Sequence, residues 1–336
     1  MKILITGGAG FIGSHLVDRL LGADNEVFVI DDLSTGDLRN VESHSGNCRF
    51  RLIIDTILNQ KIMDQVISQC DSIFHLAAGV GVKLIMEKPV ETLETNVLGT
   101  EVVLKIAHKY NKKVIIASTS EIYGKSVNEY NEPLFSEGAE SIIGPTTKRR
   151  WAYACSKALD EFLALAYHEE KGLPVIIARL FNTVGPRQTG AYGMVIPNFV
   201  QRALAGEPIF VHGDGTQSRS FIHVSDTVNA LIKLTEEGDA VGQIFNIGNP
   251  YEISIKELAH MVKTLSKSSS RIVFIPYENA YGPGFEDMQR RCPDITKLKS
   301  LIGFEPTYTL EDIIRNVIDY YKRCTIPLTS KNISFK

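Results

Sequence analysis

A glycine-rich segment near the start of the sequence constrains the fold more than any other feature. It follows the apolar run Lys2–Thr6, precedes the helically spaced segment Phe11–Leu21, and repeats glycine in the pattern G-x-x-G-x-x-G. Such a loop gives a tight turn, lets the backbone approach a pyrophosphate closely, and lets the helix pack closely on the strand. The pattern therefore predicts a dinucleotide held at the helix N-terminus, with contacts from Gly7, Gly10, Phe11, Ile12 and Gly13.

An acidic pair follows the next apolar run, Glu26–Ile30, about twenty positions beyond the glycine-rich loop. A carboxylate here accepts hydrogen bonds from both ribose hydroxyls and repels a 2′-phosphate, so it favours NAD over NADP. We prefer Asp31 to Asp32 for this role because Asp31 ends the predicted strand. Asp55, after the third predicted strand, has two interpretations, which are a contact to the adenine edge and an ordinary loop aspartate.

Short apolar runs alternate with amphipathic segments, which predicts a doubly wound α/β fold with a parallel sheet covered on both faces. The predicted strands are Lys2–Thr6, Glu26–Ile30, Arg51–Ile54, Ser72–Leu76, Lys113–Ser118 and Val175–Leu180. The predicted helices include Phe11–Leu21, Leu93–Tyr110, Trp151–Glu170, Asp226–Leu234, Ile255–Leu265 and Leu310–Tyr321. We expect a dinucleotide-binding domain over 1–182, completed by part of 222–248, then a smaller substrate-binding lobe over 183–330 and a tail at 331–336.

Composition and charge narrow the class of partner. The 336 residues carry 36 Lys+Arg against 39 Asp+Glu, and the longest basic run is Lys148–Arg150. This pattern predicts no binding to nucleic acid, and no apolar stretch reaches the ~20 residues that span a bilayer. The five cysteines are widely spaced without a C-x-x-C pair, so we expect neither a disulfide framework nor a metal site. We expect a cytoplasmic protein with a small-molecule partner and no membrane partner.

A tyrosine and a lysine are four residues apart in the predicted helix Trp151–Glu170, so Tyr153 and Lys157 lie on one face. A nearby lysine, helped by the positive charge of a nicotinamide, stabilises a phenolate and suits the tyrosine to act as a base. The segment Ser118–Glu121 ends a predicted strand, and its hydroxyls can hold a substrate hydroxyl. These features together predict a site that abstracts a proton.

With these motifs, the sequence resembles the extended short-chain dehydrogenase/reductase family, in its branch of nucleotide-sugar epimerases, dehydratases and decarboxylases. The resemblance covers almost the entire chain. It rests on Thr6–Gly13, His75–Ala78, Asn96–Thr100, Thr119–Gly124, Tyr153 with Lys157, Arg179–Arg187 and Gly213–Arg219. It implies a Rossmann-type fold, a tightly held NAD that is reduced and reoxidised within one turnover, and a nucleoside diphosphate sugar in the cleft between two lobes.

The resemblance also implies roles for residues at matching positions. Tyr153 acts as the base, Lys157 supports it, and Thr119 holds the sugar hydroxyl. The further cofactor contacts that the resemblance implies are Leu76, Ala77, Ala78 and Asn96, together with Tyr153 and Lys157. The implied substrate contacts are Asn182, Arg187, Val195, Arg219 and Arg291. The arginines suit a diphosphate because a guanidinium offers a fork of hydrogen-bond donors.

Three reactions of this branch begin with oxidation of the sugar at C4. A 4-epimerase lets the keto sugar turn over, a 4,6-dehydratase removes the C5 proton and loses water, and a decarboxylase loses carbon dioxide from a β-keto acid. Glu121 stands where dehydratases and decarboxylases keep a working glutamate, beside Ser120 instead of the aspartate typical of dTDP-glucose dehydratases. The stretches 144–153 and 281–294 resemble UDP-glucuronate decarboxylases, although Arg-Cys-Pro-Asp at 291–294 departs from their usual Arg-Lys-Pro.

A UDP-hexuronate decarboxylase is therefore our first interpretation, a UDP-sugar 4-epimerase is the alternative, and a dehydratase is third. In the decarboxylase, Arg291 lies near C5 and C6 opposite Ser120 and Glu121, and it assists carboxylate binding or protonation of the enolate. In an epimerase, Arg291 serves as a phosphate clamp. A noncatalytic sensor or binding protein would need a broken site, and the Tyr153 and Lys157 pair is intact.

The predicted helices Leu93–Tyr110 and Trp151–Glu170 each carry apolar residues on more than one face. Packing on one side of the sheet accounts for only one such face. In the family that the sequence resembles, helices at these positions form a dimeric four-helix bundle, so we expect a homodimer.

Overall fold

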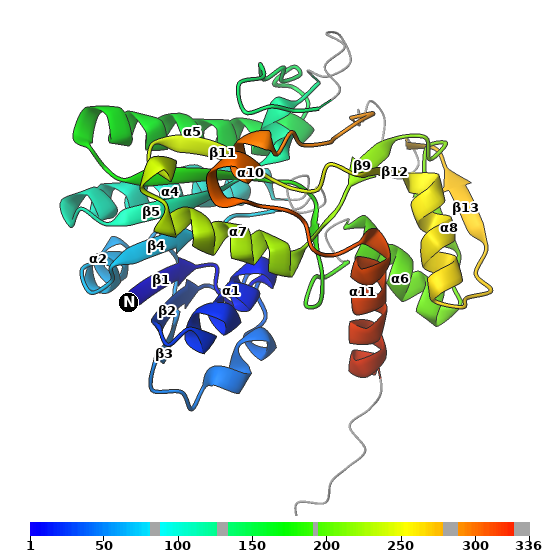
Figure 1. Ribbon diagram of the computed structural model, residues 1–336, viewed down its shortest axis with the longest axis horizontal. Coiled ribbons are helices and arrows are strands. Elements are labelled where there is room, and N and C mark those ends of the chain that lie inside the picture. Colours follow the sequence, from blue (N-terminus) through cyan, green and yellow to red (C-terminus); the bar gives the residue numbers. More distant parts are fainter. Residues whose placement is uncertain (81–87, 126–133, 191–193, 278–287, 326–336) are drawn as a thin grey trace, which may run out of the picture.

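A parallel sheet of seven strands forms the centre of the molecule (Figure 1). The computed structural model describes residues 1–80, 88–125, 134–190, 194–277 and 288–325. The strand order is β11-β6-β5-β4-β1-β2-β3. The strands are β1 (Lys2–Thr6), β2 (Glu26–Asp31), β3 (Phe50–Ile54), β4 (Ser72–His75), β5 (Lys113–Thr119), β6 (Val175–Leu180) and β11 (Gln243–Ile247). The predicted doubly wound α/β fold is confirmed.

Helices cover both faces of this sheet because successive strand residues point to opposite sides. Ile3 and Ile5 pack with one group of helices, whereas Leu4 between them packs with the other. The first group is α1 (Phe11–Gly22), α7 (Val224–Glu236) and α10 (Thr296–Ile302). The second group is α2 (Gln60–Ile67), α4 (Pro89–Lys109) and α5 (Arg150–Lys171). Two apolar cores therefore sandwich the sheet.

A third apolar core lies in the group of elements seen at one end of the sheet in Figure 1. It is built from α6 (Val195–Ala205), α8 (Ile255–Leu265) and α11 (Leu310–Thr325), with β8 (Ile209–His212) parallel to β13 (Ile272–Ile275). Two short strand pairs join this group to the rest: β7 (Thr183–Val184) with β10 (Ile222–His223), and β9 (Ser218–Ser220) with β12 (Glu252–Ser254). Short 3₁₀ turns occupy Leu38–Asn40, Glu42–His44, Ser120–Tyr123 (η3) and Gly238–Ala240.

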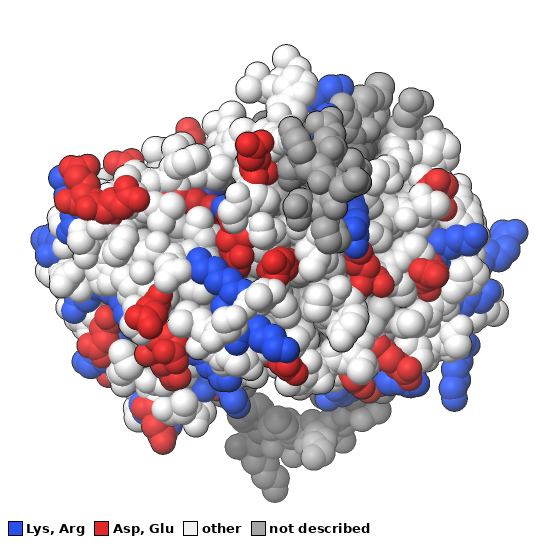
Figure 2. All heavy atoms as spheres, turned by 45° about the horizontal axis from the view of Figure 1, so that its top comes forward, with Lys and Arg blue, Asp and Glu red and all other residues white. Residues whose placement is uncertain are grey.

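The chain crosses between these parts more than once. After β10, helix α7 returns to the central sheet, and β11 pairs in parallel with β6 at its edge. Basic and acidic side chains are intermixed on the face drawn in Figure 2. Among the described residues, no helix is long and apolar enough to cross a membrane, and no group of His, Cys, Asp or Glu is arranged to hold a metal ion.

Candidate active site

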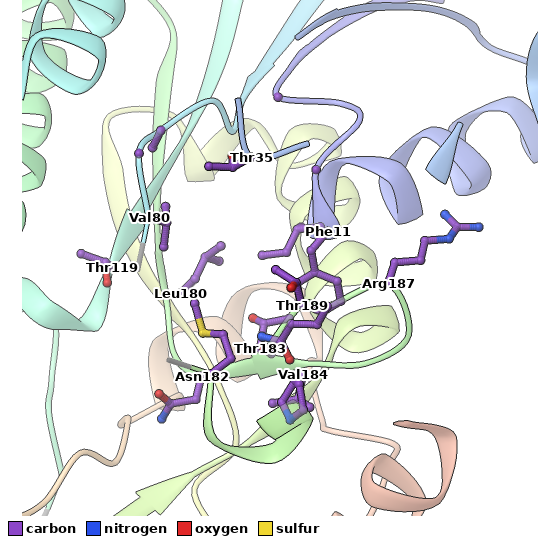
Figure 3. A pocket seen from close by; sticks show the side chains of 18 of the residues that line it. Phe11, Thr35, Val80, Thr119, Leu180, Asn182, Thr183, Val184, Arg187 and Thr189 are labelled. Carbon is purple, nitrogen blue, oxygen red and sulfur yellow. Dashed lines mark hydrogen bonds between the residues drawn. The ribbon is translucent and has the colours of Figure 1, made fainter. Parts of the chain in front are cut away.

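A cavity of about 1190 Å³ lies where the carboxyl ends of the sheet strands meet the group of α6, α8 and α11. Its lining includes most of the residues that the sequence singled out. These are Gly7, Gly10, Phe11, Ile12, Gly13, Asp31, Asp32, Asp55, Leu76, Ala77, Ala78, Thr119, Ser120, Glu121, Tyr153, Asn182, Arg187, Val195, Arg219 and Arg291. Asn96 and Lys157 do not line the cavity. Figure 3 shows that the lining side chains come from both the sheet and the loops that follow it.

The glycine-rich loop forms one end of the cavity and leaves room for a ligand backbone. Gly7 has a φ of +72°, and a Cβ added to Gly13 would lie 2.2 Å from the Gly7 carbonyl oxygen. No side chain caps the N-terminus of α1 at Gly10, and its first turn contains no acidic residue. The amides and dipole of such a helix start attract an anion, so this loop fits the pyrophosphate of a dinucleotide.

The two aspartates that follow β2 differ in their surroundings. Asp31 is buried, and its carboxylate accepts hydrogen bonds from the amides of Ala9 and Leu33, each at 2.9 Å. Burial raises the pKa of Asp31 from its ordinary value. Asp32 is exposed and accepts hydrogen bonds from the amide and hydroxyl of Ser34. Asp31 is thus the carboxylate that the structure ties to the glycine-rich loop.

Asn96 acts through the loop that follows β4 and not as part of the cavity wall. It is 1% exposed, its Oδ1 accepts from the amide of Gly79 at 2.8 Å, and its Nδ2 donates to Ser156 Oγ at 3.2 Å. The loop that it holds includes Ala77 and Ala78, which line the cavity. Asp55 accepts from the side chain of Asn59 at 2.9 Å while also lining the cavity.

The predicted base lies beside the end of β5. Tyr153 is 8% exposed, and burial together with the charges of Glu121 and Asp160 raises its pKa well above the ordinary value. A hydrogen bond with Thr119 and the positive charge of Arg291 lower the pKa of Tyr153 and offset part of this rise. Tyr153 and Thr119 therefore face the same part of the cavity, where a substrate hydroxyl can meet both.

An arginine distant in sequence closes this end of the cavity. Arg291 Nη1 donates to Glu121 Oε1 at 2.6 Å and lies 3.4 Å from Ser120 Oγ. The Arg291 and Glu121 side chains are 12% and 17% exposed. Arg291 Nε is buried and has no hydrogen-bond partner within the part of the chain that the structure describes. The structure thus brings Arg291, Ser120 and Glu121 together.

Lys157 is one helical turn beyond Tyr153 on α5 and does not line the cavity. Its Nζ donates to Asp160 Oδ2 at 2.9 Å, and the two side chains are 2% and 1% exposed. The sequence identified Lys157 through its spacing from Tyr153 but did not single out Asp160.

The substrate candidates divide between two regions. Asn182 Nδ2 donates to the Ser220 carbonyl at 2.8 Å, and Arg219 is 7% exposed on β9. Arg187 instead forms a 2.8 Å ion pair with Asp18 of α1. Figure 3 shows Arg187 beyond Phe11, on the far side of the view from Thr119 and Asn182. The structure therefore places Arg187 with the glycine-rich end.

Other lining residues were missed in the sequence. Arg202 lies over the ring of Phe210 at 4.3 Å, and Gln217 and Tyr277 also line this part of the cavity. The sequence does contain a signal for Phe210, which is the alternation of side-chain direction along β8. Ile209 and Val211 are buried in the core, so the residue between them points to the opposite side. These side chains offer a planar surface with a cation, which suits a flat ring.

Comparisons with known proteins agree with this geometry. Residues 4–317 match the family described as GDP-mannose 4,6 dehydratase. UDP-N-acetyl-alpha-D-glucosaminuronate decarboxylase of Bacillus cytotoxicus is 44% identical over 322 residues, which are 96% of this chain and 98% of that protein. UDP-glucuronic acid decarboxylase 1 of Danio rerio is 40% identical over 96% of this chain and 73% of that protein. These relatives carry the name of the reaction that the sequence favoured.

Solved structures extend the comparison to the alternative reactions. UDP-glucuronic acid 4-epimerase from Bacillus cereus, in complex with UDP-glucuronic acid and NAD, has a TM-score of 0.86 and 29% identity, covering 96% of this chain and 100% of its own. dTDP-glucose 4,6-dehydratase from Bacillus anthracis, in complex with NAD, has a TM-score of 0.83 and 29% identity, with 96% and 97% covered. The expectation of NAD for this family is confirmed. The chain belongs to the extended short-chain dehydrogenase/reductase family, among the nucleotide-sugar enzymes grouped with GDP-mannose 4,6-dehydratase.

Proposed function

We propose that this protein is an NAD-dependent decarboxylase of a UDP-linked hexuronate that acts through transient oxidation of the sugar at C4. The observation that carries the proposal is the contact of Arg291 with Glu121 and Ser120 beside Tyr153. A cation beside a substrate carboxylate also suits a 4-epimerase that acts on a uronate. The group that distinguishes a decarboxylase is Glu121, because a carboxyl group can pass a proton to C5 and a 4-epimerase needs only a base and room for the sugar to turn. The decarboxylase names of two relatives that cover most of this chain support the same reaction.

The residues at the reacting end divide the first step between them. Thr119 and Tyr153 hold the C4 hydroxyl, and the Tyr153 phenolate takes its proton. The glycine-rich loop and Asp31 would hold NAD, which would supply a hydride acceptor for C4 and the same hydride for the final reduction. The sugar then carries a C4 ketone next to C5, so its C6 carboxylate belongs to a β-keto acid.

The second step uses the arginine and the glutamate. The Arg291 guanidinium, which lines the cavity, orients the C6 carboxylate. Loss of carbon dioxide leaves the bonding electrons in an enolate over C4 and C5. Glu121 passes a proton from water to C5, and Tyr153 returns its proton to the C4 oxygen when the hydride returns. The net change is one carboxylate and one proton converted to carbon dioxide and a C–H bond.

Mass spectrometry of the products tests this proposal directly. The purified protein is incubated without added reductant with UDP-glucuronate, with UDP-N-acetylglucosaminuronate and with UDP-glucose. Loss of the mass of one carbon dioxide from a uronate, with one deuterium at C5 when the reaction is run in D₂O, supports decarboxylation. If the mass is unchanged and NMR shows an inverted configuration at C4, the protein is a 4-epimerase. Arg291 then binds phosphate instead of the sugar carboxylate.

Replacement of Glu121 by Gln separates the two reactions within one protein. The amide cannot pass a proton to C5, so turnover stalls at the enolate and steady-state carbon dioxide release falls by roughly 10²–10³-fold while C4 oxidation persists. Glu91→Gln is the matched control, because Glu91 also lines the cavity but pairs with Lys88 at 2.8 Å. Full carbon dioxide release by Glu121→Gln overturns the role of Glu121.

We also propose that the protein is a homodimer formed through α4 and α5. These helices pack on each other and still expose large apolar side chains, with Phe162 73%, Val90 66%, Leu159 49% and Leu98 45% exposed. Such a surface gains free energy when a second copy covers it. Light scattering at micromolar concentration checks the mass, and Phe162→Glu shifts it to that of a monomer if this face is the interface.

A further inference from the structure

The ion pair of Lys157 and Asp160 is buried on α5 and has no part in the steps above. Both side chains are almost fully inaccessible, and neither is among the described residues that line the cavity. The two residues are three positions apart along α5, so they lie on neighbouring turns and their side chains meet. In surroundings that exclude water, each of these charges acts strongly on its neighbours.

Charged and titratable groups face Tyr153 and Lys157 from several elements. Glu121 approaches Tyr153 from η3, and Arg291 approaches from the segment before α10. From β4, His75 lies near Lys157, and its ring nitrogens contact the hydroxyls of Thr6 and Thr100. Burial and the Lys157 charge lower the pKa of His75 to about 3, so this imidazole is neutral at working pH. His75 therefore adds no positive charge to this group. Burial raises the pKa of Asp160 from its ordinary value, and the charge and hydrogen bond of Lys157 act in the opposite direction.

We propose that Asp160 is a positioning residue that fixes the Lys157 ammonium behind Tyr153 and offsets part of its charge. A lysine without this partner would stabilise the Tyr153 phenolate more strongly. With Asp160 in place, the phenol stays protonated until the positive charge of the oxidised nicotinamide is present. Deprotonation of Tyr153 therefore depends on the presence of the oxidised cofactor. This inference rests on the proposed function only in taking Tyr153 as the base.

The titration of Tyr153 in the NAD-bound enzyme tests this inference. The protein is labelled with ¹³Cζ-tyrosine, and the Tyr153 signal is identified by its loss in Tyr153→Phe. Asp160→Asn keeps the size of the side chain and an oxygen acceptor for Lys157 but removes the negative charge. We expect its Tyr153 midpoint to move to lower pH by roughly one unit, with the acid limb of kcat/KM moving by the same amount. Asp160→Glu restores the wild-type midpoint.

Glu161→Gln is the matched control, because it removes the next buried carboxylate on the same helix. Glu161 pairs with Arg179 at 2.7 Å instead of Lys157, so its loss leaves the Tyr153 midpoint in place. An unchanged or raised midpoint in Asp160→Asn, or an equal shift in Glu161→Gln, overturns the inference. If Asp160→Asn does not fold, Asp160→Ser carries the same expectation. A lowered midpoint in a protein that releases no carbon dioxide sustains this inference while the proposed function fails.

Discussion

The two ends of the cavity are built from different atoms and from differently spaced parts of the chain. At the glycine-rich end, the wall is mainly the backbone of residues 7–13, with Asp31 at the end of the neighbouring strand. At the reacting end, the working groups are the side chains of Tyr153, Glu121 and Arg291, and 170 residues separate the last two. Local sequence shapes the first end, whereas the tertiary fold assembles the second.

This difference predicts two kinds of sensitivity. A backbone cradle fails when a single atom is added, because neighbouring carbonyls cannot move aside. A group of side chains tolerates small changes of size but fails when a charge or a proton is lost. Substitutions at the two ends therefore separate cofactor binding from chemistry.

The largest effect on cofactor binding is expected for Gly13→Ala. The new methyl group would lie 2.2 Å from the Gly7 carbonyl oxygen, so the loop must open. We expect NAD affinity, measured by isothermal titration calorimetry, to fall by more than about 100-fold. Gly22→Ala is the control, since a Cβ there meets nothing within 4 Å. Normal NAD affinity in Gly13→Ala would show that the loop of residues 7–13 can shift to make room for the methyl group.

The largest effect on chemistry without an effect on binding is expected for Tyr153→Phe. Removing the hydroxyl removes the base but keeps the ring, so kcat falls by roughly 10²–10⁴-fold. NAD affinity stays within about twofold of wild type, because no dinucleotide cradle atom changes. A matched fall in NAD affinity would contradict the separation of the two ends.

The sequence predicted the regular elements well where the apolar pattern was long. The helix at Ile255–Leu265 is confirmed to the residue, and the predicted Phe11–Leu21 extends by one residue to Gly22. Three helices were not predicted: α2 and α10, which are short, and α6, which has the same length of 11 residues as α8. Short helices depend on tertiary packing more than on local propensity, so their sequences carry a weaker signal.

The reacting end was predictable only in part. The spacing of Tyr153 and Lys157 indicated one helix face, but spacing alone gives no sign that Asp160 is buried with the lysine, because i,i+3 pairs usually lie on exposed surfaces. The contact of Arg291 with Glu121 requires the return of the chain from the third core. Part of the 281–294 stretch and the predicted tail at 331–336 lie outside the described residues.

A smaller effect should distinguish the two aspartates after β2. Asp31 is buried against the glycine-rich loop, so Asp31→Asn loses a charged acceptor for the ribose hydroxyls and weakens NAD binding by about tenfold. Asp32 is exposed and bonded to Ser34, so Asp32→Asn changes NAD affinity by less than about twofold. Calorimetric titration of both variants checks this, and equal losses would mean that the two carboxylates share the ribose.

The smallest effect is expected at Arg187, which tests where the two ends of the cavity divide. Arg187 pairs with Asp18 of α1 and is 24% exposed, so Arg187→Gln weakens NAD binding by only about threefold. The KM of the Arg187→Gln variant for the nucleotide sugar stays unchanged. Arg219→Gln gives the reverse pattern, because Arg219 lines the cavity from β9, whose Ser220 carbonyl accepts a hydrogen bond from Asn182. If Arg187→Gln raises KM and leaves NAD affinity intact, the diphosphate of the sugar nucleotide reaches the glycine-rich end. The cavity would then be a single continuous phosphate site instead of two ends with separate tasks.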